Sequence, residues 1–387
     1  MNVCHLLNTA ARGGAEMLVL ELIKRTESTD VSYTVCYAGK KHELVPAFEQ
    51  AGAEVICLGS RTDQVQFDPT VPIRFLMAAR RKKFDILHAH MPYVQLLAQL
   101  VGRAGFVGEV ISTYHIPKDN HPKASRHIVG KTQQFDCHSV AVSDGVRASF
   151  QTDGESDTRG ATWQMIYNGI DITAFNEAVD ASPPLGEFDT DGPVFLNIGR
   201  YQQQKGQQYL VRAMDRVTDT IPDAHAIIVG YGPEKTALRE LVNELGLNES
   251  VTITGEVPSV KPYYARSDVF VFSSLFEGLP ITGIEAMAAE LPIVGTNVPG
   301  VEEVVDEPEA GLLVPPRSPA TLADAMIEVV SERDCEQMGQ RGFKRATRQF
   351  DIDQTVAAYL DLYRHTVSTS HGDLPAETVA TTDGGQL

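Results

Sequence analysis

The sequence lacks the features of exported, membrane-spanning and disulfide-stabilised proteins. Its first eight residues contain neither the basic segment nor the long apolar stretch of a signal peptide. Polar residues interrupt every hydrophobic run well before the ~18 apolar residues that a membrane span requires. The five cysteines are widely spread and never spaced as Cys-x-x-Cys, which predicts reduced thiols. We therefore expect a cytoplasmic protein whose membrane contact, if it has any, is peripheral and at the inner face of the membrane.

Positive charge is also scarce. The chain carries 33 basic and 51 acidic residues, a net charge of −18, which disfavours nucleic acid as a partner. Lysine is rarer than arginine, and acidic residues crowd the segments 153–157 and 306–309. This composition favours an acidic, halophile-like protein of a high-salt cytoplasm. Because the overall field repels anions, a few specific Arg and Lys residues must hold any anionic ligand.

What the sequence does contain is a regular alternation of strand-like and helix-like segments over 387 residues, a length that favours two domains. Such alternation is typical of parallel sheets covered by helices on both faces, so we predict the α/β class. Strands are expected at Val3–Asn8, Tyr33–Tyr37, Glu54–Leu58, Asp85–His88, Glu109–Thr113 and Ser139–Val142, and then at Val194–Ile198, Ala226–Val229, Val251–Ile253, Val269–Phe272 and Pro292–Gly295.

The domain boundary is expected in the segment 176–193, where proline, glycine and acidic residues replace the periodic pattern. We assign residues 1–178 to an N-terminal domain and 179–350 to a C-terminal domain. Residues 351–367 have apolar side chains at helical spacing and predict a terminal helix that packs back on the N-terminal domain. The remaining residues, 368–387, have the composition of a disordered tail. Ligands bind at the carboxyl ends of parallel strands, so a cleft between the domains is the expected site.

The stretch Ser273–Met287 follows a predicted strand and opens a helix. A helix start offers unpaired N–H groups and partial positive charge, so this turn can hold a diphosphate. Gly278 allows close backbone approach, and the carboxylates of Glu277 and Glu285 suit recognition of sugar or ribose hydroxyls. An alternative is that Thr282 and Glu285 form a capping box with no ligand.

The first strand of the second half ends in a loop that carries Arg200 and Lys205, followed by Gly206 at the expected start of a helix. Arginine offers a planar fork to phosphate oxygens and lysine a mobile point charge, a pair suited to a diphosphate. An alternative is a solvated surface pair.

These motifs together resemble the retaining glycosyltransferases of family four, which have the GT-B architecture of two facing Rossmann-like domains. The resemblance covers nearly the whole chain except its tail. It rests on the following segments: Gly13–Glu16, His88–His90, Ala141–Ser143, Asn168–Asp171, Arg200 with Lys205 and Gly206, Gly230–Pro233, and Glu277 with Glu285. The sequence departs from the family pattern at Glu290, where a glycine is usual, and at Asn297–Glu303, which has one glycine where two are common.

The resemblance implies a role for each matching residue. Arg200 and Lys205 would bind the donor diphosphate, Glu285 the ribose and Glu277 the transferred sugar. Gly13 and Gly14 would approach the donor phosphate from the opposite domain, although a plain tight turn is the alternative for these glycines. The donor-binding residues would be Gly13, Gly14, Arg200, Lys205, Gly278, Leu279 and Glu285, with Gly255–Val257 beside the nucleobase.

Three histidines and one basic run have further candidate roles. His115 matches a histidine near the reacting sugar in this family and is the second candidate catalytic residue beside Glu277; a structural histidine is the alternative. His88 and His90 are interpreted as structural or acceptor-side, because no acidic or cysteine partner accompanies them as in a metal site. Neither a metal nor another cofactor is expected. The basic run Arg80–Lys83 either complements a helix end or contacts anionic lipid.

The function predicted from these features is transfer of a sugar, with retention, from a nucleotide-diphosphate sugar to a glycan, lipid or small-molecule acceptor. Two alternatives remain. A sugar-nucleotide epimerase of the same architecture would release no glycoside, and a catalytically silent relative would bind without reacting. The sequence identifies neither the sugar and nucleotide nor the acceptor.

Overall fold

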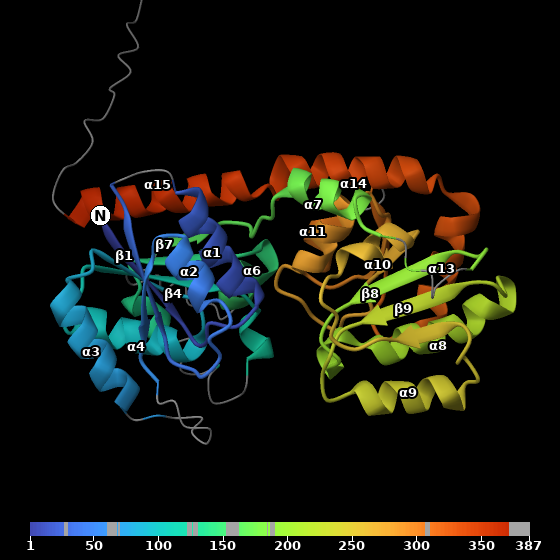
Figure 1. Cartoon of the computed structure of the whole chain (residues 1–387), viewed down its shortest axis with the longest axis horizontal. Helices are drawn as coiled ribbons and strands as arrows, with labels where there is room; N and C mark the ends of the chain where they lie inside the picture. Colours follow the sequence, from blue (N-terminus) through green and yellow to red (C-terminus); the bar gives the residue numbers. More distant parts are fainter. Residues whose placement is uncertain are drawn as a thin grey trace, which may run out of the picture.

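The computed structural model describes residues 1–26, 30–59, 68, 70–121, 126, 131–151, 162–183, 185, 190–305 and 310–370. The two acidic segments 153–157 and 306–309, Pro184, Gly186 and the tail beyond residue 370 lie outside these ranges. The described part of the chain contains no helix that is both long and apolar enough to span a membrane. Figure 1 shows two α/β domains side by side, joined by chain crossings at one end.

The first domain is built on a seven-stranded parallel sheet of order β3-β2-β1-β4-β5-β6-β7. Its strands are β1 (Asn2–Leu7), β2 (Ser32–Tyr37), β3 (Glu54–Cys57), β4 (Ile86–Ala89), β5 (Glu109–Tyr114), β6 (His138–Ala141) and β7 (Thr162–Met165). Its helical segments are α1 (Gly14–Arg25), α2 (Val45–Gln50), α3 (Thr70–Lys82), α4 (Pro92–Arg103), η1 (Lys118–Asn120), η2 (Gln133–Phe135) and α6 (Asp144–Gln151). Separate apolar clusters cover the two faces of this sheet.

The second domain repeats this plan with a six-stranded parallel sheet of order β10-β9-β8-β11-β12-β13. Its strands are β8 (Val194–Ile198), β9 (His225–Val229), β10 (Val251–Ile253), β11 (Val269–Val271), β12 (Ile293–Thr296) and β13 (Gly311–Val314). Its helical segments are α7 (Ile172–Asp180), η4 (Gln203–Lys205), α8 (Gln207–Thr220), α9 (Lys235–Glu244), α10 (Lys261–Arg266), α11 (Ile281–Ala288), α12 (Val301–Val305), α13 (Pro319–Glu332) and α14 (Cys335–Gln349). The α/β class and the two-sheet architecture predicted from the sequence are therefore confirmed.

Two strands were missing from the prediction, β7 and β13, and both lie at an edge of their sheet. Each is four residues long, and β7 is only partly buried. A central strand of a covered parallel sheet is buried on both faces and gives a continuous apolar run, as in β8. A short edge strand lacks that signal, so periodicity alone does not reveal it.

The chain crosses between the domains twice at one place. Ile170 pairs with Asp351 in an isolated bridge, and the amide of Ile352 donates to the carbonyl of Ile170 at 2.9 Å. Arg25 of α1 forms ion pairs with both Asp171 and Asp353 beside this bridge. The motif Asn168–Asp171 therefore lies at the crossing between the domains.

Helix α7 follows the first crossing and packs on α10 and α11 of the second domain. The expected boundary after residue 178 falls inside this helix, and residues 176–180, expected in a linker, are helical. Asp171 begins α7 by accepting the amide of Ala174, which a sequence pattern dominated by the following prolines did not reveal.

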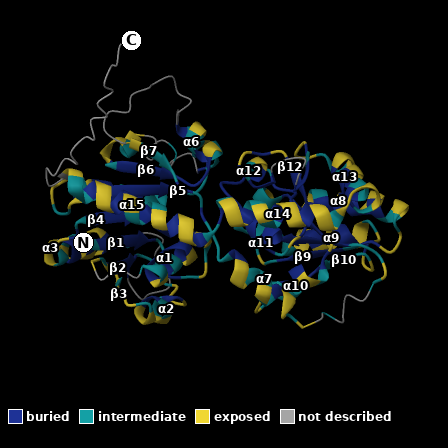
Figure 2. Ribbon diagram, turned by 90° about the horizontal axis from the view of Figure 1, so that it is seen from above, coloured by how far each residue is buried: buried dark blue, intermediate teal, exposed yellow. Residues whose placement is uncertain are grey.

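Helix α15 (Ile352–Ser370) follows the second crossing and extends three residues past the predicted end of the terminal helix. It packs on α1 and β5 of the first domain. Figure 2 shows α15 and α14 lying over the two domains in turn, with the buried strands beneath them. Residues 368–370, predicted in the tail, are therefore helical.

Candidate donor site at the carboxyl edge of the second sheet

Lys205 and Glu277 form an ion pair where two neighbouring strands end. The Nζ atom of Lys205 lies 2.7 Å from Oε1 of Glu277, and the same oxygen accepts the hydroxyl of Ser274 at 2.6 Å. Gln204 donates to the other carboxylate oxygen at 3.4 Å. Glu277 is only 5% exposed, so this carboxylate is held in one position by charged and neutral donors.

The two turns that carry this pair are joined by backbone contacts. Gly206 has φ of +59°, and a Cβ atom at this residue would lie 2.1 Å from the carbonyl oxygen of Ser273. The amide of Leu275 donates to the carbonyl of Gln204 at 2.7 Å. The hydroxyl of Ser273 donates to the backbone carbonyl of Lys205 at 2.8 Å. Only glycine fits Gly206, and its close approach fixes Lys205 relative to the turn after β11.

Gly278 places that turn against the first domain. A Cβ atom at Gly278 would lie 1.8 Å from the carbonyl oxygen of His115, which follows β5. Pro280 is the residue before the first turn of α11, with Leu279 buried next to it. The open helix start, Glu277 and His115 therefore meet at the junction of the two domains.

Arg200 lies on the same sheet edge but does not join the Lys205–Glu277 pair. Its guanidinium carbon lies 5.5 Å from the ring centre of Tyr231, on the turn after β9. Arg200 is exposed and forms no ion pair with a described residue. It is available to an anionic ligand without first breaking a salt bridge. The ring of Tyr231 limits the directions in which the guanidinium can point.

Glu285 lies on α11, and its hydrogen bond argues against the capping-box alternative. Helix α11 begins at Ile281, so Thr282 is inside the first turn and cannot be the N-cap residue. The Oε2 atom of Glu285 instead accepts the hydroxyl of Tyr264 at 2.9 Å. Burial raises the pKa of Glu285 to about 7, and the bond from Tyr264 opposes this rise. Tyr264 is a contact that the sequence did not predict.

Gly13 and Gly14 begin helix α1 in the first domain, as the sequence indicated for a turn. A Cβ atom at Gly13 would lie 2.5 Å from Oε2 of Glu16, whereas one at Gly14 would meet nothing within 4 Å. Thr9 donates to Oε1 of Glu16 at 2.9 Å and holds this carboxylate at the helix start. Contact with Glu16 thus explains a glycine at position 13 without a ligand. At Gly14 the space that a side chain would occupy is empty.

His88 and His90 lie within a buried group of imidazoles on the first sheet. The register of β1 and β4 places His5 opposite His88. Both nitrogens of His88 are engaged, one with the hydroxyl of Tyr363 at 2.6 Å and the other with that of Thr113 at 2.7 Å. His5 was missed because a lone histidine in a strand carries no spacing signal, and only strand pairing brings it to His88.

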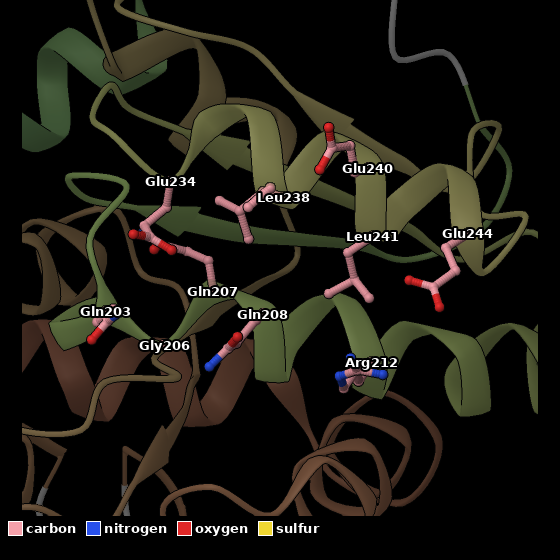
Figure 3. Close-up of a pocket in the computed structure, with 11 residues that line it drawn as sticks. Gln203, Gly206, Gln207, Gln208, Arg212, Glu234, Leu238, Glu240, Leu241 and Glu244 are labelled. Atoms are coloured by element: carbon pink, nitrogen blue, oxygen red, sulfur yellow. The ribbon is translucent and has the colours of Figure 1, made fainter.

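A separate hollow of about 250 Å³ lies between α8 and α9 (Figure 3). Three glutamates line it, Glu234, Glu240 and Glu244, with Arg212 as the one basic side chain among its lining residues. Because this lining repels phosphate, we do not place the donor in this hollow. It shares Gly206 with the turn of Lys205 but none of the candidate ligand-binding side chains.

Two facing domains of this kind, with the site between them, define the GT-B class of glycosyltransferases. The family model described as Glycosyltransferase Family 4 matches residues 12–174, and the one described as Glycosyl transferases group 1 matches residues 180–345. The two matches cover both domains. The chain therefore belongs to the family-four glycosyltransferases.

Individual relatives agree with this assignment. An uncharacterized glycosyltransferase of Methanocaldococcus jannaschii is 33% identical over 46% of this chain, which spans about half (51%) of that relative. A phosphatidyl-myo-inositol mannosyltransferase of Mycobacterium leprae is 25% identical to this chain. The alignment covers 92% of this chain and 94% of the mannosyltransferase. The Anabaena protein HepE, solved in complex with UDP, has a TM-score of 0.80 at 18% identity, covering 94% of this chain and 100% of that one. This chain is similar to each of them, and the last comparison supports the GT-B fold.

Proposed function

We propose that this glycosyltransferase takes its sugar from a nucleotide-diphosphate donor bound at the carboxyl edge of the second sheet. The observation that carries the proposal is the Lys205–Glu277 pair, whose carboxylate is buried, with Arg200 on the same sheet edge and Glu285 in the helix that follows. Lys205 and Arg200 supply positive charge in a chain of net charge −18, and the start of α11 adds the positive end of a helix dipole. UDP-glucose, bound by the Anabaena protein of the same fold, is a donor of this class.

The groups on this edge suit the parts of such a donor. Arg200 and Lys205 would bind the diphosphate, and Glu285 would accept the ribose hydroxyls. Glu277 and the backbone N–H groups of Gly278 and its neighbours would contact the transferred sugar. Because these residues already offset the charge of the leaving diphosphate, we propose a reaction without a metal or another cofactor.

We further propose that the sugar is transferred with retention, by attack on the face that the diphosphate leaves. The acceptor oxygen forms the new bond to the anomeric carbon as the carbon–oxygen bond to phosphate breaks, and the acceptor proton passes to the leaving phosphate. A covalent route would need a free carboxylate at the anomeric carbon. Oε1 of Glu277 accepts from both Lys205 and Ser274, which supports hydroxyl recognition for this residue. The anomeric configuration of the product, read by NMR, tests retention.

Substitution of Lys205 tests the donor site. We expect Lys205→Ala to raise the donor KM or lower kcat by about tenfold or more, because a charge-assisted contact to phosphate is lost. Lys344→Ala removes an exposed lysine on α14 and serves as the control. Steady-state kinetics with a donor found by thermal-shift screening provide the measurement. Unchanged donor kinetics in a folded Lys205→Ala protein would contradict the assignment.

Product analysis separates this function from its alternatives. A transferase releases free nucleotide and a glycoside only when an acceptor is present. An epimerase would convert the donor with no acceptor, and a silent binding protein would be stabilised by the donor without consuming it. Incubation of the donor alone, and then with glycan, lipid and small-molecule acceptors, distinguishes the three. The same panel identifies the acceptor class.

A peripheral membrane contact is proposed on helix α3. Ile73 and Met77 are 61% and 67% exposed and stand one turn apart, next to the basic end of the helix. Of the basic run, Arg80 stacks on Phe106 at 4.3 Å and Lys82 pairs with Glu54. The side chains of α3 therefore combine exposed apolar and basic groups, as in helices that lie on anionic lipid.

Vesicle co-sedimentation tests this contact. We expect the double variant Ile73→Ser, Met77→Ser to reduce binding to phosphatidylserine vesicles several-fold, because its apolar anchor is lost. Charge reversal at Arg81 should weaken binding mainly at low salt, whereas reversal of the exposed Arg341 on α14 is the control. Equal binding of all these variants, or no binding by the unmodified protein, would rule out the contact.

A further inference from the structure

Three imidazoles from neighbouring strands form a hydrogen-bonded chain that ends at the junction of the domains. Nδ1 of His5 on β1 lies 3.1 Å from Nε2 of His90, which follows β4. Nδ1 of His90 lies 3.5 Å from Nε2 of His115, which follows β5. His5 and His90 are 1% and 2% exposed, whereas His115 is partly exposed and its carbonyl lies against Gly278. The chain thus runs from the core to the candidate site.

Burial keeps these rings neutral. It lowers the pKa of His5 to about 3 and that of His115 to about 4. The pKa of His90 is also well below its ordinary value, first through burial and then through the neighbouring histidines. At neutral pH each ring therefore carries one N–H, and each can donate one hydrogen bond and accept one.

Only two proton arrangements satisfy both hydrogen bonds of the chain. Either all three rings carry the proton on Nδ1, or all three carry it on Nε2, because each ring must accept at one nitrogen and donate at the other. The two arrangements differ at the buried end, where Nε2 of His5 has no partner among the described residues. An Nε2–H there would be an orphaned buried donor, which is the rarer kind of unsatisfied group. The first arrangement avoids it.

We propose that His5 and His90 are positioning residues that fix His115 in the Nδ1–H tautomer. His115 then donates from Nδ1, the nitrogen that makes no hydrogen bond to a described residue, to an oxygen of a ligand in the site. The ligand class is a sugar hydroxyl of the donor, which rests on the proposed function. His115 acts as a fixed hydrogen-bond donor in this arrangement, and it does not remove a proton from the acceptor.

A metal site is the competing interpretation of the same cluster. His5, His88 and His90 have nitrogens within 4.8 Å of one another, and no carboxylate or thiolate belongs to this group among the described residues. His88 would have to give up its bond to Tyr363 or to Thr113 to bind a metal. A divalent ion would also be buried among neutral ligands without a compensating charge. The hydrogen-bonded chain requires neither change.

Histidine ¹⁵N NMR of the full-length protein tests the proposal without any substrate. The two ring nitrogens give different shifts when protonated and bare, so each of the 11 histidines reports its tautomer. His5→Asn, His90→Phe and His115→Asn variants assign the three rings, with the exposed His365→Asn as control. We expect all three chain members as Nδ1–H at pH 7. An Nε2–H form of His115, or a charged ring, would overturn the proposal.

Variants of the buried rings test the coupling. His90→Phe breaks the chain, so it should leave His115 with mixed tautomers. In His5→Leu the buried end of the chain moves to Nε2 of His90, where the Nδ1–H arrangement again avoids an orphaned buried donor, so His115 should keep the wild-type tautomer. A merely structural role would not distinguish these two variants when both fold with the same melting temperature. Unchanged His115 shifts in His90→Phe would refute the coupling.

Kinetics and metal titration complete the test. We expect His90→Phe to lower kcat about tenfold with donor KM changed less than about twofold, the loss of one positioned hydrogen bond in the reacting complex. His5→Leu should retain most of the activity that His90→Phe loses, because the bond between His90 and His115 remains. If the unmodified protein turns over no donor, the proposed function fails. The NMR result still decides whether the three rings share the Nδ1–H tautomer. A stoichiometric Co²⁺ absorption band that His90→Phe abolishes would overturn the chain in favour of a metal site.

Discussion

At the scale of single residues, the candidate site is made of charged groups. The contacts that each group already makes determine how easily it can bind a ligand. Lys205 and Glu277 neutralise each other at 2.7 Å, while Arg200 is paired with no described acid. Glu285 differs from both, because its carboxylate accepts a hydrogen bond from the neutral hydroxyl of Tyr264, while the charge of Lys261 acts on it electrostatically. A ligand can therefore engage Arg200 at once, whereas binding at Lys205 competes with an existing ion pair.

The titration of Glu285 gives a prediction for donor binding. Its pKa is raised by burial to about 7, and only the deprotonated form accepts two ribose hydroxyl bonds. Donor affinity should therefore rise as pH increases through 7 and fall below it. Tyr264→Phe removes a donor to the carboxylate, which raises its pKa and moves the midpoint upward by roughly one pH unit. Donor titrations by calorimetry between pH 5.5 and about 9 measure this midpoint.

Glu285→Gln provides the control for that experiment. It has no carboxylate to titrate, so the pH dependence assigned to Glu285 should disappear and the affinity should be low throughout. A midpoint that stays in place in both Tyr264→Phe and Glu285→Gln would show that another group titrates.

At the scale of elements, turns between strands and helices bring the domains into contact, and backbone conformation at single residues sets the shape of these turns. The turn between β11 and α11 reaches His115 through Gly278, where no Cβ fits. Glu290 lies in the turn two residues after the end of α11 and has φ of +56°, in the left-handed region that glycine favours. Glu290, which departs from the glycine usual in the family, therefore adopts a backbone conformation that is unfavourable for a non-glycine residue.

Substitution at Gly278 tests the function of the turn. Gly278→Ala would place a Cβ 1.8 Å from the carbonyl oxygen of His115, so the turn must move away. We expect kcat to fall on the order of 10²-fold, because misplacement by about 1 Å has this effect on positioned groups. Donor-induced thermal stabilisation should largely remain, because Lys205 and Glu285 belong to the second domain. Gly342→Ala, inside α14, controls for adding a methyl group to a packed glycine.

At the scale of the whole molecule, the carboxylate of Glu303 adds a contact between the two domains beside the chain crossings. Glu303 of α12 accepts the backbone amides of Asp144 and Gly145 at 2.8 Å each, at the start of α6 in the first domain. Arg345 of α14 donates to the carbonyl of Glu303 and fixes its backbone. A negative charge at a helix start is favourable, so this contact stabilises the arrangement of the domains seen here.

Removal of that carboxylate should loosen the domain contact. We expect Glu303→Ala to accelerate hydrogen exchange of the Asp144 and Gly145 amides roughly 10- to 100-fold, the loss of charge-assisted hydrogen bonds. Small-angle scattering should show a larger radius of gyration in the absence of donor. The neighbouring Glu302 is exposed, and Glu302→Ala is the matched control. Equal exchange in the two variants would show that other contacts hold the domains together.

The sequence by itself determined the alternation of elements and the positions of the motifs. Buried central strands such as β8 give continuous apolar runs, and the turns that follow them place Arg200, Lys205 and Glu277 on one sheet edge. These inferences need only the side-chain periodicity of strands and helices and the rule that parallel strands end at the same edge. The family motifs added the expected roles, which stay predictions for each residue.

Only the tertiary structure decided which side chains meet. His5 joins His90 through strand order, Tyr264 reaches Glu285 between two helices, and Glu303 reaches the start of α6 across the domain junction. The residues in the first and third of these contacts are separated by 85 and 158 positions in the chain. Strand register, helix packing and domain closure set such contacts, and no local spacing in the sequence encodes them.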